Sequence, residues 1–474
     1  MSDKTTSAPV AVAAGPDPRR WRALAILCAA YFMIIIDSQI VVLALPTIDA
    51  DLGLGAGGAQ WVMSSYLLAF GSLLLLGGRT ADLFGGRRMF LIGTALFLVA
   101  SMGCGLATSS GVLIVARVIQ GVAAAVMAPT AMAVLMTTFE QGPERNRAVG
   151  IWSGIGAFGA TAALLVGGSI TDGLGWQWIF FINVPIALLV LVSGPRLLRE
   201  TPYGQGAWTL DPIGAVTITG ALVLLVFAVV TGPDAGWASA RTVALLLAAL
   251  AALALFVAVE RKVAAPLVPP RIFRNGTLVA GNLMTLLVCI ALYGAAYNMS
   301  VYAQQVLGYS PTRFGLSTAV YAALSIIGSN VAGALIAKVG YARVGVVGAG
   351  LLTVGAFLLS RVSADGNYWT DLFPGLVVIG SGIGTTVVAG AVAALSNVNG
   401  QEAGLASGIN NSVFQIGAAL GIAISTTVAL MRHNPAAEPS TNLIEGVRSA
   451  FLAATIAAFA CLLVATTLTL RRRR

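Results

Sequence analysis

Charged residues are scarce in this 474-residue chain: they make up 9% of it, whereas 58% of the residues are hydrophobic. Ordinary soluble domains carry roughly 25% charged residues, so this composition excludes a soluble globular protein. The apolar residues form long runs instead of short alternating strands, which favours membrane-spanning helices over a β-barrel. The sequence therefore predicts an all-α integral membrane protein.

Histidine and cysteine are also sparse, with one His and four Cys. The cysteines fall in apolar runs with no CxxC or Cys/His spacing, and His433 has no neighbouring ligand residues. We therefore expect reduced cysteines, no metal site and no cofactor. The sequence holds no HExxH and no Asp-rich pair, and its loops are too short for a catalytic domain, so we do not expect an enzyme.

Fourteen apolar segments are long enough to span a bilayer. They lie at about 22–45, 59–78, 88–107, 111–134, 148–170, 178–197, 211–230, 241–259, 275–300, 313–337, 344–361, 372–396, 405–430 and 447–469. Two polar stretches divide the series. We predict a tail (1–20), a six-helix bundle (21–198), two linking helices (199–273), a second six-helix bundle (274–470) and a basic tail (471–474).

The net charge of +9 follows from membrane topology and does not require a nucleic acid partner. With the N-terminus inside, 21 of the 27 Lys and Arg fall in cytoplasmic segments and five outside, leaving Arg117 within the membrane. Cytoplasmic loops carry an excess of basic residues. We therefore predict that both termini are cytoplasmic, in the inner membrane of a bacterium, with lipid head groups near the terminal arginines.

A weak internal repeat relates the two six-span groups. Segment 78–88, between spans two and three, and segment 333–343, between spans ten and eleven, each hold two glycines seven residues apart and end on Arg. Repeated bundles around a central cavity are typical of secondary transporters.

Segment 78–88 is also a candidate conformational latch. Its glycines permit a tight turn, and its acid can cap a helix or pair with an arginine. The alternative is a solvated turn whose arginines only set topology. The latch candidates are Gly78, Asp82, Gly85, Arg87 and Arg88.

Asp37 is the only charged residue in the apolar run 23–48. A carboxylate near the bilayer centre costs roughly 2.5–3.5 kcal/mol, so it needs a partner or a function. At 1.5 Å per residue Asp37 lies about 21 Å into span one, and Arg117 lies at the matching depth in span four. Arginine does not deprotonate. We predict that Asp37 carries a proton beside Arg117; a structural ion pair is the alternative.

Aromatic, amide, hydroxyl and Met side chains on the central spans are candidates for a substrate cavity. They suit bulky, partly apolar compounds that are neutral or cationic, because Arg117 is the only buried cation. For each one, packing between helices is the alternative. The candidates are Tyr31, Ser38, Gln39, Gln60, Trp61, Ser64, Gln120, Met127, Asn298, Tyr302, Gln304, Asn410, Asn411 and Gln415.

Segment 78–88 resembles the signature loop of the major facilitator superfamily. Five further segments resemble, in order, motifs of its fourteen-span drug:proton antiporter family: 37–46, 117–121, 176–185, 305–311 and 404–408. The resemblance implies a major-facilitator fold and proton-coupled export of lipophilic drugs or metabolites, driven by the proton motive force. We expect a monomer among membrane lipids.

The fifth span departs from the family pattern. Ala163 and Leu164 stand where the antiporter motif has Gly-Pro, and in the first span Gln39 and Val42 replace the usual Thr and Asn. A facilitator or importer that is not coupled to proton antiport therefore stays an alternative. A channel is disfavoured, because it would not need two matched halves with loops of this kind.

Overall fold

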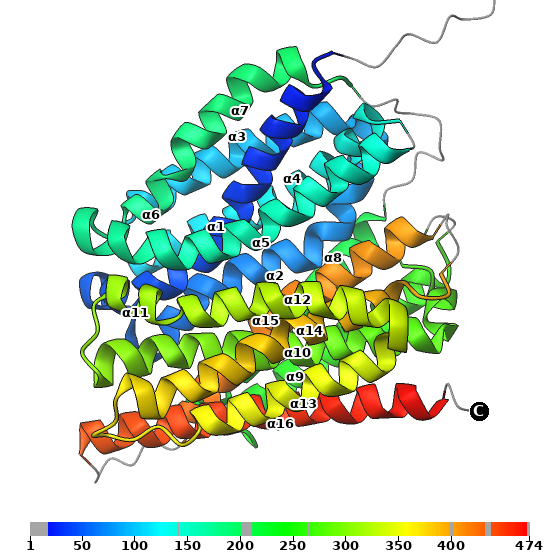
Figure 1. Cartoon of the computed structure of the whole chain (residues 1–474). Helices are drawn as coiled ribbons and strands as arrows, with labels where there is room; N and C mark the ends of the chain where they lie inside the picture. The colour runs from blue at the N-terminus through cyan, green and yellow to red at the C-terminus, as the bar shows by residue number, and fades with distance from the viewer. Residues whose placement is uncertain are drawn as a thin grey trace, which may run out of the picture.

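The computed structural model describes residues 18–140, 142–200, 211–263, 266, 268–398, 402–431 and 438–471, and their regular structure is helical (Figure 1). The N-terminal half comprises α1 (Arg20–Leu52), α2 (Gly55–Phe84), α3 (Gly86–Gly105), α4 (Ser110–Thr138), α5 (Pro143–Leu174), α6 (Trp178–Phe181) and α7 (Asn183–Leu197). The linking elements are α8 (Pro212–Ala235), α9 (Ala240–Glu260) and the 3₁₀ turn η1 (Pro270–Arg274).

The C-terminal half comprises α10 (Gly276–Val301), the π turn η2 (Tyr302–Val306), α11 (Pro311–Ser317), α12 (Ala319–Val339), α13 (Tyr341–Leu359), the π turn η3 (Tyr368–Leu372), α14 (Phe373–Leu395), α15 (Ala403–Leu430) and α16 (Pro439–Arg471).

Twelve helical segments of the described chain are long and apolar enough to cross a membrane. Two more, within α5 and α8, carry shorter apolar stretches, Ala162–Leu174 and Val216–Val229, where the fifth and seventh spans were predicted. The chain is therefore a multi-pass membrane protein, as the sequence predicted. The count of fourteen spans and the cytoplasmic placement of the termini stay predictions.

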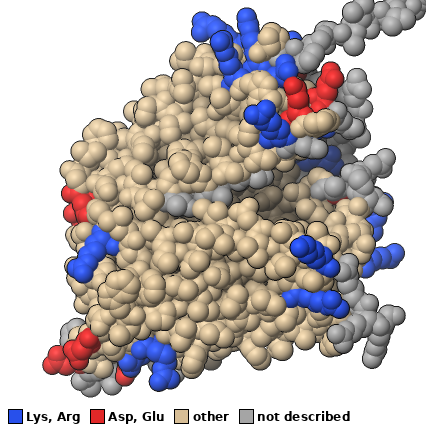
Figure 2. Space-filling model, viewed as in Figure 1, with Lys and Arg blue, Asp and Glu red and all other residues tan. Residues whose placement is uncertain are grey.

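The described chain begins and ends at the same end of the helices (Figure 1), which we call the termini side; the opposite end is the far side. Most of the Lys and Arg side chains visible in Figure 2 lie toward the termini side. This charge distribution is what the topology rule requires of a cytoplasmic face.

Several helices begin where a short polar side chain caps them. Ser109, Ser239 and Ser310 each accept a hydrogen bond from the backbone N–H three residues later, and Asn275 accepts one from the N–H of Thr277. Such caps satisfy backbone donors that a helix leaves open at its start. The apolar runs set the lengths of the helices, and the caps set where these four begin.

The predicted repeat has matching backbone geometry in its two copies. Gly85 joins α2 to α3 with φ of 92°, and Gly340 joins α12 to α13 with φ of 84°. Only glycine adopts this region without strain. The second glycine of each copy therefore makes the same turn in both halves.

Close approach between α2 and α4 depends on Gly77. A Cβ at this position would overlap the backbone carbonyl of Ala125 in α4. At the adjacent Gly78, the nearest atom to a Cβ would be Pro129 Cβ at 3.6 Å, an ordinary contact. Gly77 therefore allows backbone-to-backbone packing, which is common between membrane helices.

Gly77→Ala is expected to lower the melting temperature of the purified protein, because overpacking a close contact costs about 1–3 kcal/mol. Thermal unfolding in detergent would measure this, with Gly78→Ala as the matched control. Equal melting temperatures for the two variants would show that α2 and α4 do not pack as described.

Candidate functional site

Asp37 and Arg117 form an ion pair inside the N-terminal half. Asp37 lies in α1 and Arg117 in α4, and Nη1 of the arginine lies 2.6 Å from Oδ2 of the acid. Both side chains are 0% exposed. Arg117 Nε also donates to the backbone oxygen of Val62, at 3.0 Å. The matching depths predicted from the sequence thus correspond to a direct contact.

Neutral polar side chains complete the surroundings of this pair. Gln120 Nε2 donates to Asp37 Oδ1 at 3.1 Å, and Asn183 Nδ2 donates to the same oxygen at 2.8 Å. Gln120 also accepts from Arg117 Nη1 at 2.9 Å and donates to Ser101 Oγ at 2.8 Å. We call these five residues the Asp37 network. The carboxylate of Asp37 accepts three hydrogen bonds, one from each of Arg117, Gln120 and Asn183.

Aromatic rings cover the rest of the guanidinium. The Cζ atom of Arg117 lies 4.2 Å from the centre of the Tyr66 ring and 5.8 Å from that of Phe180. Arg117 Nη2 has no hydrogen-bond partner in the described part of the chain. Cation–π attraction strengthens where the charge is desolvated, as it is here.

The Asp37 network ties several helices together. It joins α1, α3, α4 and α7, because Ser101 lies in α3 and Asn183 is the first residue of α7. A proton on Asp37 Oδ2 would displace the contact with Arg117 and leave a buried cation without its counter-charge.

In the sequence, Asn183 stood out only as part of segment 176–185, and its contact with Asp37 was not anticipated. An amide within an apolar span was the available signal, but nothing in the spacing pointed toward Asp37. The side chain is 0% exposed, so its only useful partners are within the protein.

Asn183→Ala is expected to destabilise the folded protein by about 1.5–3 kcal/mol, the range for a hydrogen bond to a charged group. Thermal unfolding in detergent would measure the loss. Asn330→Ala is the control, because that amide donates to its own helix at Ile326 and is exposed. A melting temperature for Asn183→Ala equal to that of the control would contradict the described contact.

The predicted latch makes its described contacts within the N-terminal half. The backbone N–H of Arg87 donates to Glu200 Oε1 at 3.0 Å, and Arg87 Nε lies 3.4 Å from Glu200 Oε2. Gly85 is needed here, because a Cβ would come within 2.6 Å of the same carboxylate. The side chain of Asp82 lies outside the described residues. Glu200, just after α7, was not anticipated, and a latch between the two bundles stays a prediction.

Three cavity candidates reach across to the other half. Gln39 Nε2 donates to Tyr293 Oη at 3.1 Å, and Ser64 Oγ donates to the backbone oxygen of Ala419 at 3.5 Å. Gln304 donates to a backbone carbonyl of α1. These side chains lie at the interface between the two halves.

Three other cavity candidates are fully buried inside one half in this structure, and a contact between them and a substrate stays a prediction. Gln120 belongs to the Asp37 network. Met127 is 0% exposed and fills the space above Gly93 between α3 and α4. Tyr302 is also 0% exposed, and its hydroxyl donates to Asp371 Oδ2 at 2.8 Å. A polar or soft residue in a central span does not reveal which way it faces.

Four of the remaining candidates donate hydrogen bonds within their own helix or their own half. Ser38, Asn298 and Asn411 donate to backbone oxygens of their own helices. Asn410 donates to Asn282 and Thr285 within the C-terminal half.

Two aromatic candidates pack against other rings, and two amides retain unused oxygens. Tyr31 stacks on Trp152 at 4.2 Å between ring centres, and Trp61 lies 6.0 Å from Phe227 of α8. The Oε1 atoms of Gln60 and Gln415 are buried and have no hydrogen-bond partner among the described residues.

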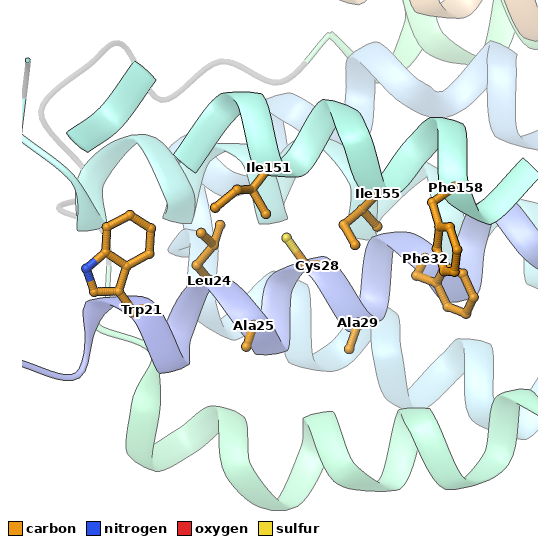
Figure 3. A pocket seen from close by; sticks show the side chains of 9 residues that line it. All are labelled: Trp21, Leu24, Ala25, Cys28, Ala29, Phe32, Ile151, Ile155 and Phe158. Atoms are coloured by element: carbon orange, nitrogen blue, oxygen red, sulfur yellow. The ribbon is translucent and has the colours of Figure 1, made fainter. Parts of the chain in front are cut away.

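An apolar cavity of about 480 Å³ lies between α1 and α5 (Figure 3). None of the predicted polar candidates lines it. Its side chains resemble ordinary core residues in the sequence, so no pattern singled them out. The lining residues are Trp21, Leu24, Ala25, Cys28, Ala29, Phe32, Ile151, Ile155 and Phe158.

This cavity lies on the face of α1 that meets the C-terminal half. Gln39, which bonds Tyr293 of that half, follows Phe32 by seven residues, or about two helical turns. Both therefore project from the same side of α1. On the far side, Asp172 of α5 accepts from the backbone N–H of Thr312 at 2.9 Å, which joins the halves there. The cavity lies in the termini-side part of α1 and α5.

Within the described residues, no group of three or more His, Cys, Asp or Glu is placed to hold a metal ion. The four cysteines are free and buried. The ionisable pair at the centre of the site is therefore Asp37 and Arg117.

Comparisons with known proteins agree on one family. The family model described as Major Facilitator Superfamily matches residues 27–422. The puromycin resistance protein pur8 of Streptomyces alboniger is 38% identical over 418 residues, which cover 88% of this chain and 83% of that protein. The cephamycin export protein CmcT of Amycolatopsis lactamdurans is also 38% identical, over 86% of this chain and 84% of that protein.

Solved structures share the fold at low identity. A POT family peptide transporter superposes with a TM-score of 0.67 at 17% identity, covering 96% of this chain and 97% of that one. A bacterial homologue of the lysosomal transporter Spinster, solved in an inward-facing conformation, gives a TM-score of 0.65 at 18% identity, covering 96% and 98%.

Proposed function

Because the chain belongs to the major facilitator superfamily, we propose that it exports small lipophilic compounds, neutral or cationic, from the cell by proton-coupled alternating access. The relatives named above carry out resistance to puromycin and export of cephamycin, which supports efflux. We assign the protein as a transporter and not as an enzyme. It acts as a monomer among membrane lipids, with the proton motive force as its energy source and no cofactor.

The observation that carries the coupling proposal is the sealed Asp37 network. Among the described residues, Asp37 is the acid that pairs with Arg117, and both lie at 0% exposure within the N-terminal half. A buried ion pair is stable only while both side chains are charged, because loss of one charge leaves the other without compensation. Proton binding at Asp37 therefore provides the energy change that rearranges α1, α4 and α7.

The apolar cavity supports the choice of substrate. A volume of about 480 Å³ falls within the range of roughly 300–1,000 Å³ for small-molecule sites. Its walls carry no charged side chain, so a strongly ionic compound would lose hydration without compensation. With the termini side in the cytoplasm, the cavity receives compounds from inside the cell or from the inner leaflet.

Uncoupled facilitation or import is the weaker alternative. It arose from Ala163 and Leu164, which replace a Gly-Pro pair in α5. The glycines around them still allow α5 to pack tightly on α1, since a Cβ at Gly159 would lie 3.1 Å from Ile35 and one at Gly167 would overlap Ile40. Close packing of α1 and α5 is therefore kept without the proline.

Asp37→Asn is expected to abolish transport driven by a pH gradient, because the amide cannot bind and release a proton. Uptake of a lipophilic cation such as ethidium into inverted proteoliposomes, with and without an imposed gradient, would measure this. Asp37→Glu is the matched control, since it keeps an acid at the same place.

Counterflow of the same dye without a gradient distinguishes loss of coupling from loss of folding. We expect the Asp37→Asn variant to retain counterflow. Gradient-driven uptake at the parent rate by Asp37→Asn would rule out Asp37 as the proton carrier. Indifference of the parent protein to the gradient would favour the uncoupled alternative.

Ala29→Phe is expected to fill part of the apolar cavity and to reduce efflux of bulky compounds several-fold while sparing small ones. A panel of dyes of increasing size, assayed in whole cells, would measure the dependence. Leu247→Phe is the control, because Leu247 lies on α9 and is 60% exposed. An equal reduction for every dye would contradict a role for this cavity in binding.

A further inference from the structure

Pro46 leaves α1 with a backbone carbonyl that its own helix cannot satisfy. It lies within α1, and proline has no N–H to donate to the carbonyl of Val42 four residues earlier. Val42 and Leu43 are 5% and 0% exposed, so water does not readily reach this stretch. A buried carbonyl without a donor is unfavourable and requires another partner.

The C-terminal half supplies that partner. Ser300 Oγ donates to the backbone oxygen of Val42 at 2.9 Å, and Gln304 Nε2 donates to that of Leu43 at 3.1 Å. Gln304 Nε2 also lies 2.8 Å from Ser300 Oγ, so the two side chains act together. They stand four residues apart and therefore project from the same side of the chain.

A π turn helps to set this geometry. Ser300 lies in the last turn of α10, and Gln304 lies in η2, the π turn that follows. Such turns are widened relative to an α-helix and are frequent at functional sites.

These hydrogen bonds join the two halves toward the far side. The same region also holds the contact between Asp172 and the N–H of Thr312. Nearer the termini side, α1 and α5 line the open cavity instead. The bonds from Ser300 and Gln304 therefore hold closed the side of the protein that faces away from the cavity.

We propose that Pro46, Ser300 and Gln304 form a carbonyl latch that keeps the far-side gate shut. The proline frees the carbonyl of Val42, the serine binds it, and the glutamine binds both the serine and the neighbouring carbonyl of Leu43. This rests on the alternating-access function proposed above. Opening to the far side requires these bonds to break, so the three residues set the balance between the two access states. They are positioning residues and need not touch the substrate.

Distances between spin labels at the far side would test the latch. Leu106→Cys and Leu316→Cys offer exposed positions, at 66% and 61%, one in each half, while the four native cysteines are buried. Double electron–electron resonance in lipid nanodiscs, without substrate or gradient, would measure the fraction of molecules with the far side open. We expect Ser300→Ala and Gln304→Leu each to raise the ratio of open to closed molecules roughly fivefold, the factor for one hydrogen bond.

Pro46→Ala restores an N–H in α1 that competes for the carbonyl of Val42. It is expected to raise the open fraction as well, and Ser300→Ala is expected to add little in that background. Thr353→Val is the control, since its hydroxyl bonds only its own helix in the described structure. Size-exclusion profile and melting temperature would establish that each variant is folded.

Folded Ser300→Ala and Gln304→Leu variants with the parent distance distribution would overturn the latch. So would full additivity of Ser300→Ala and Pro46→Ala, because the serine would then not depend on the carbonyl that the proline frees. If Pro46→Ala does not fold, the distance distributions of Ser300→Ala and Gln304→Leu decide the test by themselves. No substrate or proton is involved, so the outcome is separable from the test of Asp37.

Discussion

Much of the N-terminal half is arranged around the buried ion pair between Asp37 and Arg117. Two charges removed from water are stable only if their hydrogen-bonding capacity is met within the protein. Ser101, Gln120 and Asn183 meet much of it, so α1, α3, α4 and α7 are tied around one point. The surrounding apolar residues can then pack at full density without exposing either charge.

Polar groups are arranged differently inside the N-terminal half and at the interface between the two halves. In the N-terminal half, polar side chains are concentrated around one buried acid. At the interface, single bonds such as that between Gln39 and Tyr293 connect the halves at separate places. A dense internal network suits a body that moves as a unit, whereas sparse interface bonds can be exchanged during a conformational change.

Much of the fold was predictable, because span length and charge placement follow from the bilayer. The pairing of Asp37 with Arg117 was also predictable from their depths. Side-chain direction was not. Nothing in the sequence distinguishes Met127, buried inside one half, from Gln39, which faces the other, because rotation of a helix about its axis depends on its neighbours. The cavity at Phe32 was missed for the same reason: an apolar residue that lines an open space looks like one in the core.

The enclosure of Asp37 also bears on the energy stored across the membrane. Each elementary charge that crosses a potential of 100 mV releases about 2.3 kcal/mol. If water could reach the acid from both sides at once, protons would leak through the protein and the gradient would be lost without driving transport. The 0% exposure of Asp37 keeps water from the acid in this structure, and under the proposed coupling a proton passes only when the helices expose the acid to one side or the other.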